Sequence, residues 1–269
     1  MKLTKLASAA LMAMAASSTV NAVQLDVSIT NLTHAQTFTP RLVIAHDATY
    51  DAFEAGQDAS TALAWLAEAG VIDDVQNATS SGQNFEAELG PVDTDNGANT
   101  WHRFGGTLGP SASLSYPFDT MDKPYLSLLT MLVPTNDAFA GLDSIKIPTE
   151  PGTYTYMLHA YDAGTELNDE LNSTRTDVLE AGTGNALGGY GLPGVAGVGA
   201  SPVAVGVGGT GVGATVIAGE IEDGTDGPIH IHRGILGDTS LTGGASDLDS
   251  TAHRWLNPVA RVTITVPAS

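Results

Sequence analysis

The residues with the clearest potential for chemistry are carboxylates that follow two expected strands. Asp137 comes shortly after the apolar segment 125–133, and Asp162 and Glu166 come after the alternating segment 152–161. If the two strands are neighbours and their ends meet, three carboxylates converge without a nearby Lys or Arg. Such a group repels itself unless a cation neutralises it, and hard oxygen ligands favour Ca²⁺. The same residues could instead form an ordinary solvated acidic loop, because the whole chain is acidic.

A pair of histidines, His230 and His232, offers a second kind of chemistry. Residues two apart on a strand project to the same face, so both imidazoles could bind Zn²⁺ or Cu²⁺. The sequence does not fix a third ligand, although His253, Asp223 and Asp226 are candidates. The alternative is a solvated histidine pair with no metal. A transition-metal site at the two histidines is therefore a second hypothesis beside calcium.

The sequence gives no positive support for an enzyme. It contains no cysteine, which excludes disulfides, thiolate metal sites and cysteine nucleophiles. It has no GxSxG, HExxH or P-loop lysine motif, so the common hydrolase and nucleotide-binding signatures are missing. Residues 93–97 (DTDNG) resemble the start of an EF-hand loop, but the glycine comes one position early and Phe104 replaces the bidentate Glu. A hydrolase therefore has no positive support from motifs, and a hydrolase with an unrecognised carboxylate site is a third hypothesis.

Composition limits the possible partners. The 269 residues include 10 Lys and Arg against 30 Asp and Glu, which gives a net charge of −20. A field of this sign repels phosphate backbones, so we expect no nucleic-acid partner. It also disfavours anionic membrane surfaces, while it attracts cations. Hydrophobic residues make up 42% of the chain, which is enough for a buried core.

The first 22 residues have the organisation of a bacterial secretory signal. Lys2 and Lys5 precede the apolar run 6–16, and small residues lead up to Ala22. The run has 11 residues, whereas a membrane-spanning helix needs about 20, so a cleaved signal is the better interpretation. Without residues 1–22 the chain loses two lysines and no acid, and its charge becomes −22. No later segment is apolar enough to span a membrane, so we expect an exported protein, periplasmic or extracellular.

The elements that would position these groups are mostly strands. Period-two alternation or a short apolar run predicts strands at 23–32, 41–46, 125–133, 152–161 and 258–267. One helix is expected at 61–70, with Ser60 as its N-cap and Gly70 as its stop. Residues 73–112 are polar and rich in Gly and Asn, so we interpret them mainly as loops.

A long segment rich in Gly, Ala and Val occupies residues 182–219. Glycine at this density disfavours any packed element on entropic grounds, so we expect a flexible insertion. Residues 23–269 then form one all-β domain with one short helix and a Gly-rich insertion.

Several blocks of the sequence resemble the spondin N-terminal domain family. Residues 126–144 (LSLLTMLVPTNDAFAGLDS) are similar to its apolar strand, its Val-Pro-x-x-Asp loop and its Gly-x-Asp-Ser turn. Residues 161–166 (YDAGTE) resemble the family's Tyr-Asp-Ala-Gly-Thr-Asp block. Four further blocks resemble the family in the same order along the chain: 37–47 (TFTPRLVIAHD), 55–70 (AGQDASTALAWLAEAG), 230–237 (HIHRGILG) and 255–264 (WLNPVARVTI).

The resemblance implies a C2-like antiparallel β-sandwich that binds calcium. By position, Asp137, Asp162 and Glu166 match the family's calcium ligands. Two departures affect this loop region. Glu166 stands where the family has Asp, and Ala138 stands where a Trp often follows the Asp. The longer Glu side chain can still chelate but shifts the ion, and the missing Trp removes a packing support.

In animals, domains of this family belong to secreted matrix and cell-adhesion proteins. The resemblance therefore implies an exported, non-catalytic calcium-binding module that contacts a protein partner or a surface glycan. The alternative function is a periplasmic copper- or zinc-binding protein that uses His230 and His232.

Overall fold

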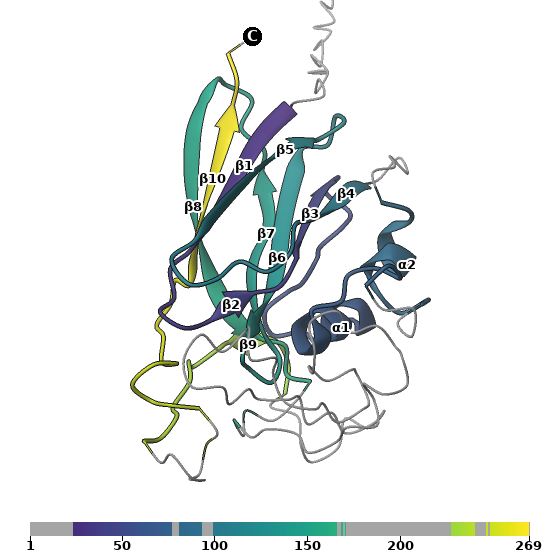
Figure 1. The fold of residues 1–269 in the computed structure, drawn as a ribbon. Helices are drawn as coiled ribbons and strands as arrows, with labels where there is room; N and C mark the ends of the chain where they lie inside the picture. The colour runs from purple at the N-terminus through teal and green to yellow at the C-terminus, as the bar shows by residue number, and fades with distance from the viewer. Residues whose placement is uncertain are drawn as a thin grey trace, which may run out of the picture.

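Ten strands and two helices make up the described part of the chain (Figure 1). The computed structural model describes residues 24–76, 81–92, 99–165, 168, 170, 227–239, 246 and 248–268. The strands are β1 (Gln24–Asn31), β2 (Thr37–Phe38), β3 (Arg41–His46), β4 (Asn99–Phe104), β5 (Ser113–Asp119), β6 (Tyr125–Val133), β7 (Ala138–Lys146), β8 (Gly152–Asp162), β9 (His230–Ile231) and β10 (Ala260–Val266). The helices are α1 (Thr61–Ala69) and α2 (Phe85–Leu89).

The strands form one nearly closed antiparallel sheet that folds into two layers (Figure 1). Along the sheet the order is β4-β3-β6-β7-β8-β10-β1-β5, while β2 pairs with β6 and β9 pairs with β8. The long strand β8 belongs to both layers, because residues 152–158 pair with β10 and residues 159–162 pair with β7. The all-β, antiparallel sandwich expected from the sequence is confirmed.

Hydrophobic side chains pack on both faces of the layer that contains β3 and β6. Between the two layers, Val43 and Leu128 belong to the same buried cluster as Val262 of β10. On the outer face, Ile44 of β3 belongs to a second cluster with Leu63 of α1. Eight of the nine residues of β6 are buried, which explains why its sequence is continuously apolar, whereas β1 alternates because only one of its faces is covered.

The five strands predicted from the sequence are present as β1, β3, β6, β8 and β10. The predicted helix is also present as α1. Ser60 Oγ accepts a hydrogen bond from Leu63 N at 3.1 Å, and Gly70 ends the helix in the left-handed conformation with φ +65°. A Cβ at Gly70 would lie 2.6 Å from Thr39 Cγ2, so both conformation and space favour glycine there. α1 packs against β6 and β7.

Most of the described residues in 73–112 are loops, as predicted, but the region also contains two elements that the sequence analysis did not predict. This region contains α2 and β4, so the described part of the chain has two helices where one was expected, and β5 follows directly. β4 and β5 are the two edge strands of the sheet, and β5 is largely exposed. Edge strands need less apolar surface and tolerate proline, here Pro117, so their sequences lack a clear hydrophobic pattern.

The segment after β6 was expected to form a loop followed by a Gly-x-Asp-Ser turn, but the structure differs from this expectation. Residues 138–146 form the strand β7, and the expected turn at 141–144 lies within it. The pairing of β7 with β6 is irregular at this point, because the register shifts between Leu126 and Leu128 of β6. Ser144 has φ +50° there. A polar motif inside a strand was therefore mistaken for a turn.

Some predicted features lie outside the described residues: the signal segment 1–22, the Gly-rich insertion 182–219 and the EF-hand-like segment 93–97. Among the described helices, none is long and apolar enough to cross a membrane.

Candidate cation site

Asp137 and Asp162 lie at the same end of two neighbouring strands. Asp137 directly precedes β7, Asp162 is the last residue of β8, and Ala138 pairs with Asp162 in the ladder. The backbone closes over the pair, because Ala163 N donates to the carbonyl oxygen of Asp137 at 3.3 Å. Both aspartates are 0% exposed. The structure therefore brings together two of the three carboxylates that the sequence singled out.

Neutral groups from the loop after β8 orient these carboxylates. Asp137 Oδ2 accepts hydrogen bonds from Thr165 N at 2.8 Å and from Thr165 Oγ1 at 3.2 Å. Asp162 Oδ1 accepts from Gly164 N at 2.8 Å, and Asp162 Oδ2 accepts from Asn168 Nδ2. These donors are neutral and orient the oxygens, while the imidazole of His230 is a further neighbour of Asp162 Oδ2, at 3.7 Å.

The loop can close this tightly because residue 164 is glycine. Gly164 has φ +73°, a conformation that L side chains rarely adopt. A Cβ at this position would also overlap the carbonyl oxygen of Gly227. The glycine of the YDAGTE block therefore lets two distant segments of the chain approach each other beside Asp162.

Glu68 is a further carboxylate at this place, and the sequence analysis did not single it out. It lies in the last turn of α1 and is 2% exposed. Its side chain hydrogen-bonds Thr165 and interacts electrostatically with Asp137. Burial raises the pKa of Glu68 well above its ordinary value, and the negative charge of Asp137 raises it further. The hydrogen bond with Thr165 lowers the pKa and so opposes this shift. A signal was available, because Glu68 is the only charged residue in the helix TALAWLAEA.

The third predicted ligand, Glu166, lies outside the described residues, although it directly follows Thr165 in the sequence. Within the part of the chain that the structure describes, no group of three or more His, Asp or Glu side chains is arranged to hold a metal ion. The site therefore has two aspartates side by side, a buried glutamate next to them, and one predicted ligand whose position is not described.

The two histidines of the alternative metal hypothesis lie near Asp162 but in different environments. The side chain of His230 is 46% exposed, and its Nε2 lies 3.7 Å from Asp162 Oδ2. His232 is 3% exposed, and both of its ring nitrogens are hydrogen-bonded: Nε2 with Asn168 Oδ1 and Nδ1 with Gly234 N, at 2.9 Å each. A metal ion could bind His232 only if one of these hydrogen bonds were broken.

Of the remaining candidates for that metal, His253 is buried, and its Nδ1 accepts a hydrogen bond from Asp249 N at 3.0 Å. Burial lowers the pKa of His253, and the interaction with Asp249 opposes this shift. Asp223 and Asp226 lie outside the described residues.

Glu170 shows how this protein satisfies a buried carboxylate by itself. Its two oxygens accept hydrogen bonds from Leu236 N at 2.6 Å, Gly237 N at 2.8 Å and Ser246 Oγ at 2.7 Å. Its backbone N also donates to Asn136 Oδ1 at 3.2 Å, beside Asp137. Glu170 therefore fastens the segment around residue 236 to the loop before β7.

A second buried polar cluster lies toward the other end of the β6–β7 pair. Ser127 Oγ contacts His46 Nε2, donates to Asp143 Oδ1 and accepts from Ser144 N, at 2.9 Å each. His46 Nδ1 bonds the carbonyl oxygen of Asp47 at 2.8 Å. A serine next to a histidine is a common hydrolase feature, but both side chains are 0% exposed here. The hydroxyl is therefore closed to a substrate in this structure.

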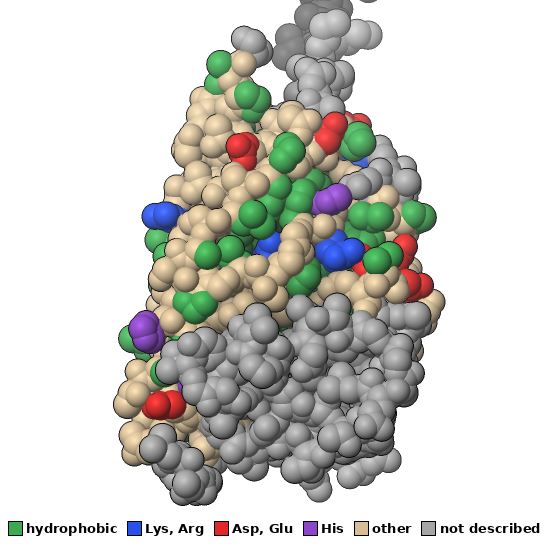
Figure 2. Space-filling model, in the orientation of Figure 1, with side chains coloured by type: hydrophobic (Ala, Val, Ile, Leu, Met, Phe, Trp, Pro, Cys, Tyr) green, Lys and Arg blue, Asp and Glu red, His purple; other side chains and the backbone are tan. Residues whose placement is uncertain are grey.

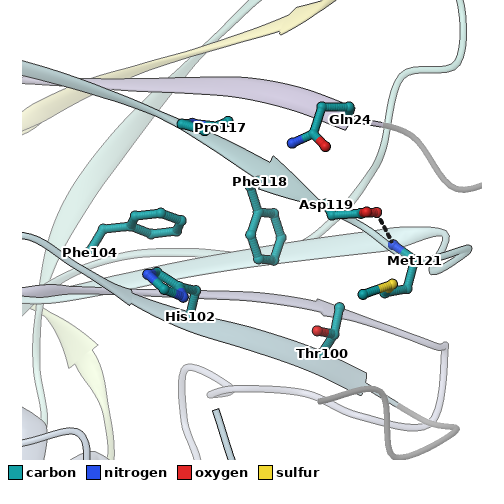
Figure 3. Close-up of a pocket in the computed structure, with 8 residues that line it drawn as sticks. All are labelled: Gln24, Thr100, His102, Phe104, Pro117, Phe118, Asp119 and Met121. Atoms are coloured by element: carbon teal, nitrogen blue, oxygen red, sulfur yellow. Dashed lines mark hydrogen bonds between the residues drawn. The ribbon is translucent and has the colours of Figure 1, made fainter. Parts of the chain in front are cut away.

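A pocket of about 390 Å³ lies between the edge strands β4 and β5 (Figure 3). Phe104 and Phe118 contribute aromatic walls, and Asp119 at its rim accepts a hydrogen bond from Met121 N at 2.9 Å. Phe104 stacks on Tyr116 with ring centroids 3.7 Å apart, so side chains connect the two edges. Hydrophobic side chains also gather on the upper part of the face in Figure 2. This mainly apolar pocket differs in chemistry from the aspartate site.

The comparison with protein families agrees with the resemblance of the sequence blocks. The family model described as Spondin_N matches residues 30–178, which is more than half of the chain. The chain therefore belongs to the spondin N-terminal domain family. The match includes Asp137, Asp162 and Glu166 but ends before His230 and His232. A comparison with curated proteins gives no match.

Proposed function

We propose that this protein is an exported, non-catalytic calcium-binding module, with Asp137, Asp162 and Glu166 as ligands of one Ca²⁺ ion. The observation that carries the proposal is the pair of fully buried aspartates at adjoining strand ends, oriented by neutral donors. Burying carboxylates is costly unless an opposite charge compensates them. A divalent cation bound by both side chains would supply that charge.

The chemistry of the donors favours calcium over other metals. Carboxylate oxygens are hard ligands, and Ca²⁺ accepts six to eight of them in a flexible arrangement. Copper and zinc prefer imidazole or thiolate, but the chain has no cysteine and the ring nitrogens of His232 are already hydrogen-bonded. The calcium hypothesis is therefore better supported than the histidine alternative.

The proposed ion would join two loops of the sandwich. Asp137 belongs to the connection between β6 and β7, and Asp162 ends β8. A shared ion would stabilise the folded state, because the unfolded chain cannot hold these ligands together. Its role in this proposal is structural, and the closed environment of Ser127 and His46 supports a function without catalysis.

The proposed location follows from the first 22 residues, which have the pattern of a cleaved secretory signal. Membership of the spondin N-terminal domain family also supports a role outside the cytoplasm. We propose contact with a protein partner or a surface glycan as the biological activity of the module, and the strong negative charge argues against a nucleic-acid partner.

Calorimetric titration of the metal-free protein tests this function. We expect Ca²⁺ binding with a stoichiometry of one for the wild type and its loss in Asp137→Asn. The exposed Asp58→Asn serves as a control with the same charge change. Zn²⁺ or Cu²⁺ binding that disappears in His232→Ala, without any Ca²⁺ binding, would instead support the transition-metal function.

A further inference from the structure

We infer that Glu68 supplies an additional carboxylate ligand to the proposed cation, so that the ion connects α1 to the ends of β7 and β8. This inference rests on the proposed function, but it concerns a residue that neither the sequence pattern nor the family match assigns to the site. Its basis is the position of one charged side chain on an otherwise apolar helix.

The first observation is the burial of Glu68. Residues 62–69 of α1 are all buried, and Glu68 is the only one among them that can carry a charge. Its Oε2 is inaccessible to solvent and has no hydrogen-bond partner among the described residues. A buried carboxylate oxygen without a hydrogen-bond partner is destabilising. A bound cation would give this oxygen a partner that the described protein groups do not supply.

The second observation is that the surroundings oppose a negative charge. Glu68 interacts with Asp137, which has the same charge, and both side chains hydrogen-bond Thr165. Glu68 also lies in the last turn of α1, and that turn contains no basic residue. The C-terminal end of a helix carries a partial negative charge and favours cations. Asp137 and the helix end therefore favour a positive charge beside Glu68, which a proton or a bound cation can supply.

Glu170 provides the contrast within the same region. Both of its oxygens accept hydrogen bonds, from two backbone N–H groups and a serine hydroxyl. Glu170 is therefore satisfied by the protein alone, whereas Glu68 has one oxygen that is not. This difference separates a structural carboxylate from a carboxylate that is available to an ion.

A ligand from α1 would change what the ion does. With Asp137 and Asp162 alone, the ion links two strand ends, whereas with Glu68 it also attaches the helix that covers β6 and β7. An additional carboxylate raises the number of oxygen ligands, which favours Ca²⁺ over the smaller, octahedral Mg²⁺. Ion binding would then stabilise the packing of α1 as well as the loops.

The test is a comparison of Ca²⁺ affinity by calorimetry in the wild type, Glu68→Gln and Glu150→Gln. Gln keeps the shape of the side chain but removes the charge. Glu150 is exposed and precedes β8, at the opposite end of that strand from Asp162, so Glu150→Gln is the matched control. We expect Glu68→Gln to weaken Ca²⁺ binding by about tenfold or more, while Glu150→Gln binds like the wild type.

The outcomes separate this inference from the proposed function. If the wild type binds Ca²⁺ and Glu68→Gln binds it equally well, Glu68 is not a ligand, but the calcium function stands. If the wild type binds no Ca²⁺, the proposed function fails, and this inference fails with it. If Glu68→Gln does not fold, a crystal structure of the wild type with Ca²⁺ decides. A Glu68 oxygen about 2.3–2.6 Å from the ion supports the inference, and a clearly longer distance overturns it.

Discussion

The strands β6 and β7 carry a buried polar cluster toward each end, and the two clusters are completed in different ways. At one end, Ser127 has hydrogen-bond partners on three sides, and His46 bonds through both ring nitrogens. At the other end, Asp137 is oriented by Thr165, but the neighbouring Glu68 keeps a buried oxygen without a partner in the described structure. The first cluster contains the groups it needs, whereas the proposed ion would complete the second.

We interpret the first cluster as structural and the second as the proposed ion site. A buried network in which every member is hydrogen-bonded contributes to a single well-defined fold. A cluster of buried carboxylates that lacks a compensating charge is a candidate ion site. The comparison predicts that damage to the His46 cluster reduces stability regardless of metal, while damage to the aspartate site removes only the effect of metal.

The largest expected effect comes from a substitution in the hydrogen-bonded cluster of His46 and Ser127. His46→Leu removes the imidazole between the Asp47 carbonyl and Ser127, and it leaves buried polar groups without a partner. We expect a decrease in the free energy of unfolding of about 3 kcal/mol, measured by urea denaturation. The decrease should be the same in Ca²⁺ and in EDTA. His34→Leu, at an exposed position, is the control and should change stability little.

If the destabilisation by His46→Leu depended on Ca²⁺, the two clusters would be coupled, and the comparison between them would fail.

The second effect concerns the aspartate site. Asp162→Asn removes one charge from the proposed ligands, while its amide oxygen can still accept from Gly164 N. We expect the variant to lose most of the stabilisation by Ca²⁺, which amounts to about 2.7 kcal/mol for the wild type at a hundredfold excess over Kd. In EDTA its stability should equal or exceed that of the wild type, because repulsion between carboxylates is reduced. A full Ca²⁺ response in Asp162→Asn would exclude Asp162 as a ligand.

The smallest effect sharpens the role of α1. Ser60→Ala removes the hydrogen-bond acceptor for Leu63 N at the start of the helix, which should lower the free energy of unfolding by about 1 kcal/mol. Since Ser60 and Glu68 lie at opposite ends of α1, the Ca²⁺ affinity of Ser60→Ala should remain that of the wild type. An unchanged melting temperature would show that the cap hydrogen bond contributes nothing.

Buried strands and the capped helix were predictable from the sequence, but the edge strands were not. β6 has a continuous apolar run because both of its faces are covered, and α1 has a serine and a glycine at its ends. β4 and β5 lie at the edges of the sheet, where one side of each strand pairs with no further strand of the sheet order and polar residues are tolerated. Hydrophobic periodicity reports burial, and it therefore fails where burial is incomplete.

The candidate site was predictable only in part, for a similar reason. Asp137 and Asp162 could be identified because each follows a recognisable strand, and the ends of neighbouring strands meet. Glu68 contacts this region from a helix about 70 residues earlier in the chain, and no pattern in the sequence shows where a helix packs. Its single charge in an apolar helix was the available signal, but tertiary structure was needed to relate it to Thr165.

Thermal unfolding of the wild-type protein in Ca²⁺ and in EDTA tests the central claim most directly. An ion that binds only the folded state adds RT ln(1 + [L]/Kd) to its stability. We therefore predict that EDTA lowers the melting temperature, that added Ca²⁺ restores it, and that Mg²⁺ restores it poorly because Mg²⁺ demands a tighter octahedral site. Identical melting curves in Ca²⁺ and in EDTA, from protein that carries no metal when purified, would contradict the assignment of a calcium site to Asp137 and Asp162.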